Sequence, residues 1–380
     1  MSELYETATR EVLRSSREIE QSSEQGDERV SEPTEDLRRA QRDHVASAVE
    51  RYRDALGGRV VVVTGGARGL GRCLVEGLLG AGASVASIDR SWAGAEDFEA
   101  ALGSDDHALA LVADITDDAA LDRAFADVMG RFGRVDVLVN NAGLVSETLF
   151  APLGHVKLLD TKDSDWEAMF KVNVFGTIKV IRRFVEPMRA AGQGSIMNIV
   201  SSGVLMTSSG GGYYGARPWT TEMPYQATKS ALTTAAFYLG QELFSEGIAV
   251  NSIMPGHTRA SWFDATARAF LEHEGGIYFM RPLVSEHMVP IVLFLGAQAG
   301  ARPPVTGRLY HAPDWNYDHG YGDYRVWGDH DVPEEVERGY RKLESALPRY
   351  WRSGLARAPF DVERVAFGAA MEKLELMGDA

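Results

Sequence analysis

Cysteine is almost absent from this chain of 380 residues. The single cysteine, Cys73, cannot form a disulfide within the chain, so nothing in the sequence requires an oxidising compartment. The first 20 residues mix charged and apolar side chains and contain no continuous apolar stretch that resembles a signal peptide. We therefore expect a cytoplasmic protein.

Long apolar runs and an excess of positive charge are lacking as well. The most apolar stretch, Met288 to Ala301, is interrupted by Pro290 and falls short of the roughly 20 residues that a membrane helix needs. Lysines and arginines number 39 against 54 aspartates and glutamates, which gives a net charge of -15. This charge would repel nucleic acid and anionic membranes, so neither is expected as a partner.

Three zones divide the chain, whose 45% hydrophobic and 24% charged residues are typical of a soluble globular protein. In residues 1–58, which are charged and nearly free of glycine, we expect a helical arm that begins near Pro33 and stops at Gly57-Gly58. A partly disordered leader is the alternative for the residues before Pro33. One face of the expected helix carries Leu37, Val45, Val49, Tyr52 and Leu56.

The second zone, residues 59–310, alternates short β-branched runs with longer helical patterns. The runs are residues 60–63, 84–88, 108–112, 135–139, 195–200 and 249–253. Strands separated by helices predict an α/β fold with a doubly wound parallel sheet, the Rossmann fold, in a single domain. Such a sheet binds its ligand at the carboxyl ends of its strands, so we expect the chemistry in the loops that follow these runs.

In the third zone, residues 311–380, we expect an irregular aromatic loop followed by a helical extension. The loop carries Trp315, Tyr317, Tyr321, Tyr324 and Trp327. One helix is expected from Asp331 to the residues before Pro348, and another over residues 361–377. We expect the aromatic segment to pack over a neighbouring subunit or the mouth of a pocket.

Potential metal ligands also occur in this third zone. They are His311, Asp314, Asp318, His319, His330 and Asp331. Their spacing fits no zinc pattern, so no metal is expected.

A glycine-rich loop follows the first predicted strand, in the sequence Thr64-Gly65-Gly66-Ala67-Arg68-Gly69-Leu70-Gly71. Glycines let the backbone approach a pyrophosphate, and the N-terminus of the next helix presents free N–H groups to it. Asp89 ends the second strand, where a carboxylate can accept both ribose hydroxyls and repel a 2′-phosphate, which favours NAD. Arg68 and Arg90 could instead clamp that phosphate, so NADP is the alternative.

Together with this loop, four further motifs resemble the short-chain dehydrogenase/reductase family. They are Asp114-Ile115, Asn140-Asn141-Ala142-Gly143, Tyr225-Gln226-Ala227-Thr228-Lys229 and Pro255-Gly256-His257-Thr258. Their order across about two thirds of the chain makes the combined match specific. The residues expected to contact the dinucleotide are Gly65, Arg68, Gly69, Leu70, Gly71, Asp89, Arg90, Asp114, Ile115, Asn141, Ala142, Gly143, Tyr225, Lys229, Pro255, Gly256 and Thr258.

Hydride transfer between a nicotinamide and a carbonyl carbon needs a group that exchanges a proton with the oxygen. A tyrosine with a pKa of about 10 needs a nearby cation to stabilise its phenolate. Tyr225 and Lys229 lie four residues apart, on one face of a helix, and can form such a pair. The resemblance implies two further catalytic residues: Ser201, with Ser202 as the fallback, would polarise the substrate oxygen, and Asn173 would hold water in a proton relay.

The chain departs from the family in two segments near the strand ends. Relative to the family, about ten extra residues are expected within residues 205–219, which include an alternative tyrosine, Tyr213. The segment 144–164 is also long. Both are expected to shape the substrate pocket. Residues 257–280 correspond to the family's mobile lid, and their aromatic side chains suggest a bulky, largely apolar alcohol or ketone. These lid aromatics are Trp262, Phe263, Phe270, Tyr278 and Phe279, and core or subunit contacts are the other explanation for them.

The sequence therefore predicts an NAD-dependent oxidoreductase that interconverts a secondary alcohol and a ketone. An NADPH-dependent ketoreductase is the alternative within this class. A non-catalytic, dinucleotide-sensing binding protein is the alternative outside it. The resemblance also implies a homodimer or homotetramer.

Overall fold

Seven parallel strands form one sheet at the centre of the protein, in the order β3-β2-β1-β4-β5-β6-β7. The structure is a computed structural model that describes residues 35–154, 156–204, 223–274 and 281–346. The strands are β1 (Val60–Thr64), β2 (Ser84–Asp89), β3 (Ala108–Val112), β4 (Val137–Asn140), β5 (Gly194–Ile199), β6 (Ile248–Met254) and β7 (Leu309–His311).

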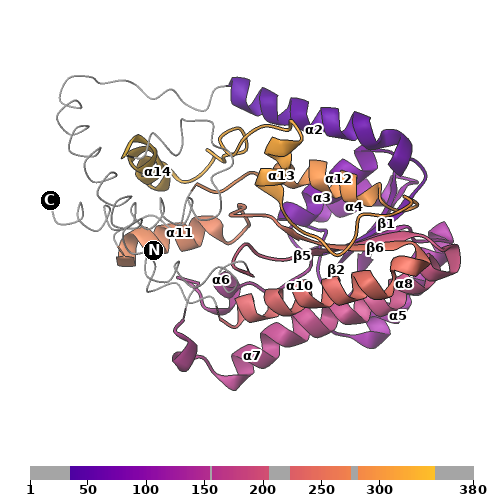
Figure 1. Cartoon of the computed structure of the whole chain (residues 1–380). Coiled ribbons are helices and arrows are strands. Elements are labelled where there is room, and N and C mark those ends of the chain that lie inside the picture. The colour runs from indigo at the N-terminus through magenta and orange to yellow at the C-terminus, as the bar shows by residue number, and fades with distance from the viewer. Residues whose placement is uncertain (1–34, 155, 205–222, 275–280, 347–380) are drawn as a thin grey trace, which may run out of the picture.

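Helices cover both faces of the sheet (Figure 1). The longer ones are α2 (Glu35–Leu56), α3 (Gly69–Gly80), α4 (Glu96–Gly103), α5 (Asp118–Phe132), α7 (Asp163–Phe170), α8 (Thr177–Ala191), α10 (Tyr225–Glu242), α11 (Phe263–Glu274), α12 (Val289–Gly296) and α14 (Glu334–Ala346). The shorter ones are α6 (Ser146–Leu149), η2 (Leu158–Asp160), the π-helix η3 (Lys171–Gly176), η4 (Phe244–Glu246), η5 (Ser285–Met288) and α13 (Ala312–Asp318).

The valine run of β1 shows why the strands are apolar throughout. Val61 and Val63 belong to the core under α3 and α12, whereas Val62 belongs to the core under α5 and α8. Successive side chains of a strand point to opposite faces, so a strand covered on both sides must be apolar at every position. The doubly wound parallel sheet predicted from the sequence is confirmed.

Two elements differ from the expectation. β7 is a seventh strand that the sequence did not reveal, because it has three residues and pairs with β6 alone. Helix α13 forms where an irregular aromatic loop was expected, with Pro313 in its first turn and Trp315 buried against the core. The expected helix over residues 361–377 and the segment before Pro33 lie outside the described residues.

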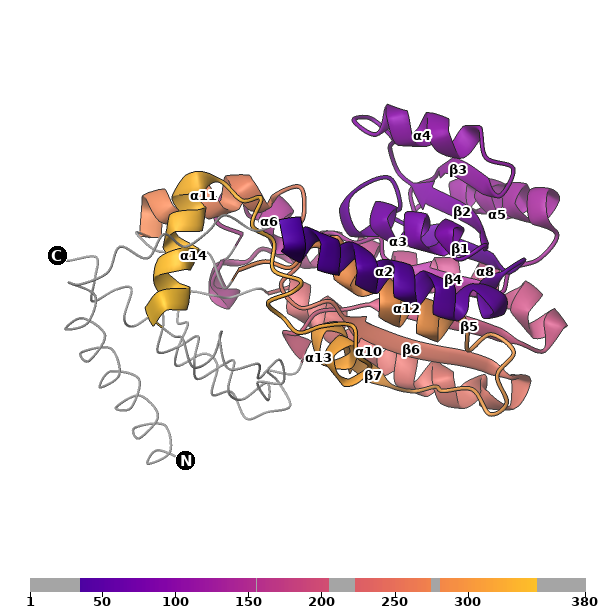
Figure 2. The same cartoon turned by 90° about the horizontal axis from the view of Figure 1, so that it is seen from above.

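The N-terminal helix α2 packs on α12 and α3 (Figure 2). It also contacts the segment after α13. Gln41 Nε2 donates to the carbonyl of Val326 at 2.7 Å, and the rings of His44 and Trp327 lie 5.8 Å apart. Helix α2 and the segment after α13 therefore meet on one side of the sheet.

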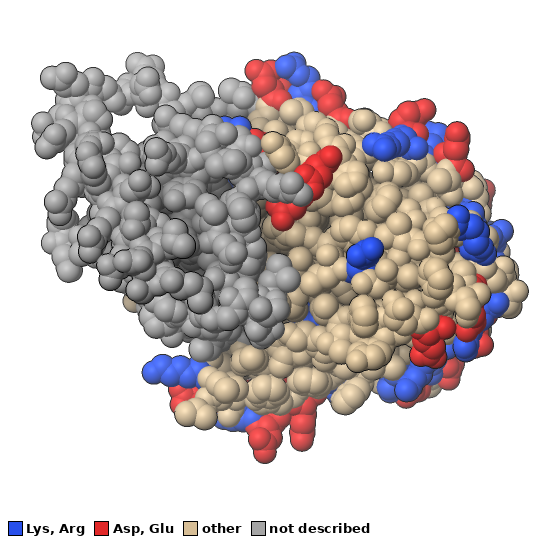
Figure 3. Space-filling model, viewed as in Figure 1, with Lys and Arg blue, Asp and Glu red and all other residues tan. Residues whose placement is uncertain are grey.

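No helix in the described ranges is long and apolar enough to cross a membrane. On the face shown in Figure 3, acidic and basic side chains are interspersed around the rim of the described surface. This face carries no continuous basic area among its described residues.

Candidate active site

The loop between β1 and α3 and the first turn of α3 contain two glycines, Gly65 and Gly71, at positions where a side chain would be strained or would clash with the backbone. Gly65 has a φ of +69°, and a side chain on Gly71 would place its Cβ 1.9 Å from the carbonyl oxygen of Gly65. Asn141, after β4, donates from Nδ2 to the carbonyls of Thr64 at 3.1 Å and Gly65 at 3.0 Å. The loop is therefore held open and bare at the N-terminus of α3, as a pyrophosphate requires.

A cavity of about 280 Å³ lies beside this loop, at the carboxyl ends of β1 to β4. Its lining includes the predicted residues Gly65, Asp89, Arg90, Asp114, Ile115, Asn141, Ala142 and Gly143. Asp89 is fixed by the backbone N–H groups of Ala67 and Ser91, at 3.1 and 3.2 Å. Arg68 does not line this cavity, because its guanidinium donates to the carbonyls of Ser91 and Ala93.

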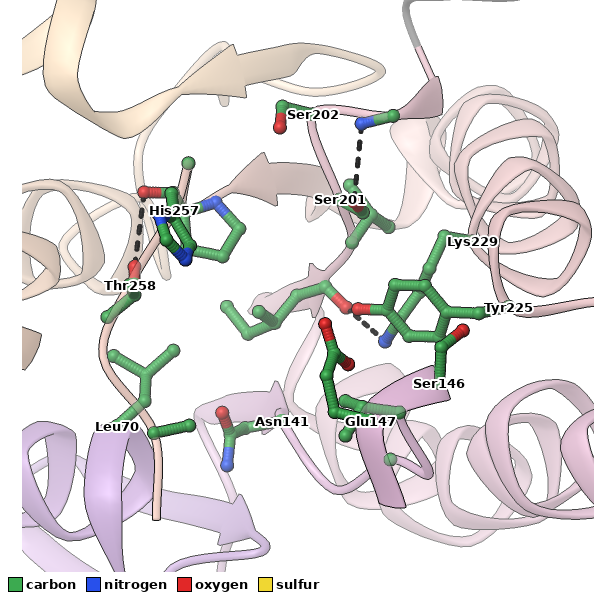
Figure 4. A pocket seen from close by; sticks show the side chains of 18 of the residues that line it. Leu70, Asn141, Ser146, Glu147, Ser201, Ser202, Tyr225, Lys229, His257 and Thr258 are labelled. Carbon is green, nitrogen blue, oxygen red and sulfur yellow. Dashed lines mark hydrogen bonds between the residues drawn. The ribbon is translucent and has the colours of Figure 1, made fainter. Parts of the chain in front are cut away.

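A second cavity of about 250 Å³ shares Asn141 and Gly143 with the first. It is lined by the predicted residues Leu70, Ser201, Tyr225, Lys229, Pro255, Gly256 and Thr258, and by the fallback Ser202 (Figure 4). Residues from β5, α10 and the loop after β6, far apart in the sequence, are thus brought together. Of the predicted set, Gly69 and Gly71 lie within the first turn of α3, and Asn173 is in the lining of neither cavity.

Tyr225 and Lys229 lie on the first turns of α10. Lys229 is 5% exposed, its Nζ lies 5.6 Å from the centroid of the Tyr225 ring, and it donates to the carbonyl of Ile199 at 2.9 Å. Burial lowers the pKa of Lys229 from 10.5 to about 8. The Lys229 ammonium therefore lies beside the Tyr225 phenol, and removing that charge from water destabilises the folded state.

The Ser201 hydroxyl is oriented by two donors. Its oxygen accepts from Gln226 Nε2 at 3.1 Å and from the backbone N–H of Gly203 at 3.2 Å. Both contacts use the oxygen as acceptor, so the hydroxyl hydrogen can be donated to a substrate oxygen. Sequence reasoning missed Gln226, and its position next to Tyr225 was the only available signal.

Asn173 lies in the π-helix η3 and is fully buried. Its Oδ1 accepts from the N–H of Leu144 at 2.7 Å, and its Nδ2 donates to the Leu144 carbonyl at 2.9 Å and to Thr228 Oγ1 at 3.0 Å. A Cβ on Gly143 would lie 3.3 Å from Asn173 Oδ1 and 3.4 Å from Lys229 Nζ. Asn173 therefore ties the loop after β4 to Thr228 of α10, the residue before Lys229. Thr228, which completes this tie, was also missed.

The expected aromatic lid divides between the cavity and the core. Trp262 lines the second cavity, whereas Phe263 and Phe270 are at most 1% exposed and pack inside the protein. Tyr278, Phe279 and the insertion with Tyr213 lie outside the described residues. From the long segment 144–164, Ser146 and Glu147 line the cavity, and neither was predicted.

The histidines and aspartates of the third zone do not converge on a point. His311 pairs with Asp314, Nδ1 to Oδ2 at 3.0 Å, and the His319 ring stacks on Trp315 at 4.0 Å. Within the described part of the chain, no three such side chains gather as a metal site would require.

Comparison with known proteins agrees with this arrangement. The family model for short chain dehydrogenase matches residues 59–269. A fluoren-9-ol dehydrogenase of Terrabacter sp. (strain DBF63) is 59% identical over 334 residues, which cover 88% of this chain and 93% of that protein. A sorbitol dehydrogenase of Cereibacter sphaeroides is 33% identical over 220 residues, covering 58% and 78%.

A solved structure from Bacillus thuringiensis is similar at a TM-score of 0.52 and 22% identity, covering 67% of this chain and 95% of its own. At this identity it supports the fold alone. The family uses NAD or NADP to oxidise or reduce small molecules, and the enzymatic prediction is confirmed, whereas the non-catalytic alternative is not supported. With its glycine loop, strand-end cavities and matched sequence, the chain belongs to the short-chain dehydrogenase/reductase family and is an alcohol/ketone oxidoreductase.

Proposed function

We propose that the protein oxidises a neutral, largely apolar secondary alcohol to a ketone with NAD, and that Tyr225, Lys229, Ser201 and Asn173 form its catalytic set. The observation that carries this proposal is the second cavity, which is lined by Tyr225, Lys229 and Ser201 and adjoins the glycine-loop cavity. A substrate there lies beside both the phenol and the dinucleotide site.

The residues of the first cavity fit NAD. Gly65 and Gly71 leave the backbone bare where a pyrophosphate would approach, and Asp89 lies where the adenosine ribose would bind. The Asp89 carboxylate would repel a 2′-phosphate, and Arg68 is turned onto two carbonyls outside the cavity lining. Arg90, which does line the cavity, is the observation in favour of NADP. Comparing kcat/KM with the two dinucleotides decides between them.

The proton chemistry follows from the second cavity. NAD, when bound, supplies the hydride acceptor. Tyr225 takes the proton from the alcohol, because the Lys229 ammonium beside it stabilises the phenolate. Ser201 donates a hydrogen bond to the substrate oxygen, and Gln226 fixes its orientation. Asn173 ties the β4 loop to Thr228 of α10, and its proposed role is to hold water in a proton relay that reaches Lys229.

The substrate class is argued from the cavity walls and from the relative. Apolar side chains make up much of the lining: Leu70, Val145, Ile199, Val200 and Trp262. The relative at 59% identity is a fluoren-9-ol dehydrogenase, and its match extends beyond the family model into the terminal segments. Fluoren-9-ol, a rigid and apolar secondary alcohol, is therefore the first substrate to assay.

The test is Tyr225→Phe, with Tyr238→Phe as its control. Tyr238 lies on the same helix and is 69% exposed, so its hydroxyl takes no part in the cavity. Tyr225→Phe should lose turnover of fluoren-9-ol by about 10³-fold or more, the scale of a lost acid/base group. Its affinity for NAD should remain near that of the wild type. Turnover retained in Tyr225→Phe, or lost equally in Tyr238→Phe, would refute the catalytic assignment.

A further inference from the structure

The loop after β6, residues 255–260 (the rim loop), forms one wall of the second cavity. All six of its residues line that cavity. A displaced wall weakens its contacts with a bound substrate and so lowers the affinity. What holds the rim loop in place therefore matters for substrate binding.

The rim loop is held by two further segments through backbone hydrogen bonds. Leu283 donates to the carbonyl of His257 at 2.7 Å, and the Leu283 carbonyl accepts from Arg259 at 2.9 Å. On the other side of this middle segment (residues 281–284), Val284 donates to the Trp327 carbonyl at 2.9 Å. The chain after β7 is thus two backbone layers away from the cavity.

Side chains reinforce the same connection. Arg259 donates to both carboxylate oxygens of Asp264, at 2.9 and 3.0 Å, and to Asp329 Oδ2 at 3.2 Å. Burial opposes the charge of Arg259, but the Asp329 and Asp264 carboxylates outweigh it and raise the pKa of the guanidinium. One guanidinium thereby joins the rim loop, α11 and the chain after β7.

A second tie passes through His287, which is fully buried. Its Nε2 lies 2.7 Å from the Pro255 carbonyl oxygen, and its Nδ1 lies 2.7 Å from that of Val284. Asn316 of α13 donates to the carbonyl of His287 at 2.7 Å. The first residue of the rim loop is therefore also linked to the chain after β7.

The segment after β7 is anchored at its C-terminal end by a buried ion pair. Glu337 of α14 pairs with Arg281, at the start of the middle segment, at 2.6 Å, and both side chains are 5% exposed. Burial raises the pKa of Glu337, but the neighbouring His330 and Arg281 side chains outweigh it and lower the pKa to about 2. Glu335 adds a contact to Arg268 of α11 at 2.6 Å.

We propose that four residues after β7 act as a positioning device that holds the rim loop against the substrate, chiefly through the Asp329–Arg259 pair. They are Asn316, Trp327, Asp329 and Glu337. This inference rests on the proposed function. The device sets the affinity for the alcohol, whereas the chemical step belongs to Tyr225, Lys229 and Ser201 on another wall of the cavity.

The experiment uses the full chain with Asp329→Asn, because Asp329 is 8% exposed and does not line the cavity. The control is Asp323→Asn, which removes a carboxylate from the same segment, where it pairs with Arg325 at 2.7 Å. Asp329→Asn should raise KM for fluoren-9-ol about tenfold and change kcat less than about twofold, whereas the control should change neither. In an Arg259→Met background, Asp329→Asn should add nothing further, because both act through one contact.

Hydrogen exchange gives a readout that needs no substrate. Asp329→Asn should speed exchange at the amides of Arg259 and Leu283 and leave β5 and α10 unchanged. If Asp329→Asn does not form a cooperatively folded protein, Asp329→Ser takes its place, because the serine hydroxyl can still accept from the N–H of Asp331. Unchanged KM and exchange, or an effect of the same size in the Arg259→Met background, would overturn the inference. If the wild type turns over no secondary alcohol, the proposed function is contradicted instead. The hydrogen-exchange result would still test whether Asp329 positions the rim loop.

Discussion

Replacing Lys229 by methionine is expected to abolish turnover and to make the folded protein more stable. Burial of the ammonium group lowers its pKa from 10.5 to about 8. A tenfold change in an acidity constant corresponds to about 1.4 kcal/mol, so keeping this group charged near pH 7 costs the folded state about 3 kcal/mol. Methionine has a similar length and no charge, so it removes this cost.

The gain is offset in part by the hydrogen bond from Lys229 to the Ile199 carbonyl, at 2.9 Å. Losing that bond costs about 1 kcal/mol, and water in the cavity can replace the donor. We therefore expect Lys229→Met to raise the free energy of unfolding by about 1–2 kcal/mol near pH 7. Such a gain in stability on removing a functional residue is expected of a site that is held charged for its chemistry.

The pH dependence gives this prediction its signature. Since the folded pKa of about 8 lies below the unfolded value of 10.5, the unfolded chain binds an extra proton between these pH values. Wild-type stability therefore rises with pH relative to the variant, whose advantage is complete below about pH 8 and is lost as the pH rises toward 10.5. Urea unfolding at several pH values measures it, with the exposed Lys171→Met as control. A variant less stable than the wild type near pH 7, or a difference independent of pH, would refute the reasoning.

Two further substitutions test the remaining parts of the site. Gly71→Ala would place a methyl group 1.9 Å from the carbonyl oxygen of Gly65, so NAD affinity should fall by about 100-fold or more; near-normal binding in an equilibrium titration would contradict the assigned dinucleotide site. Gln226→Leu removes the 3.1 Å donor to Ser201, and kcat should fall about tenfold with KM little changed. An unchanged kcat in steady-state assays would show that Ser201 is oriented without Gln226.

The sheet could be predicted from the sequence because its causes are local. A strand covered on both faces must be continuously apolar, and the valines of β1 display this directly. The glycine loop and the Tyr225–Lys229 spacing are equally local. The glycines let the backbone approach a pyrophosphate, and a spacing of four residues places Tyr225 and Lys229 on one face of a helix. Most of the site residues predicted from these patterns line one of the two cavities.

The contacts that were missed depend on partners distant in the sequence. Nothing near Ser201 indicates that Gln226 will orient it, 25 residues later in the chain. In the same way, Asp329 pairs with Arg259, which lies 70 residues earlier in the sequence. Strand β7 has only three residues, too few for a recognisable strand pattern. Such pairings follow from the completed fold, so single-sequence patterns do not contain them.

The contact between α2 and the chain after β7 has a consequence for how the protein is made. Gln41 and Val326 are separated by 285 residues, and synthesis at roughly 5–20 residues per second puts tens of seconds between their emergence from the ribosome. During this interval α2 lacks its contact with Val326. Helix α3, whose N-terminus borders the glycine loop, also packs on η5 and α12, which are made later than most of the sheet. Both cavities are therefore completed only when the last quarter of the chain has been made, and we expect binding of the dinucleotide and of the alcohol to appear together, late in synthesis.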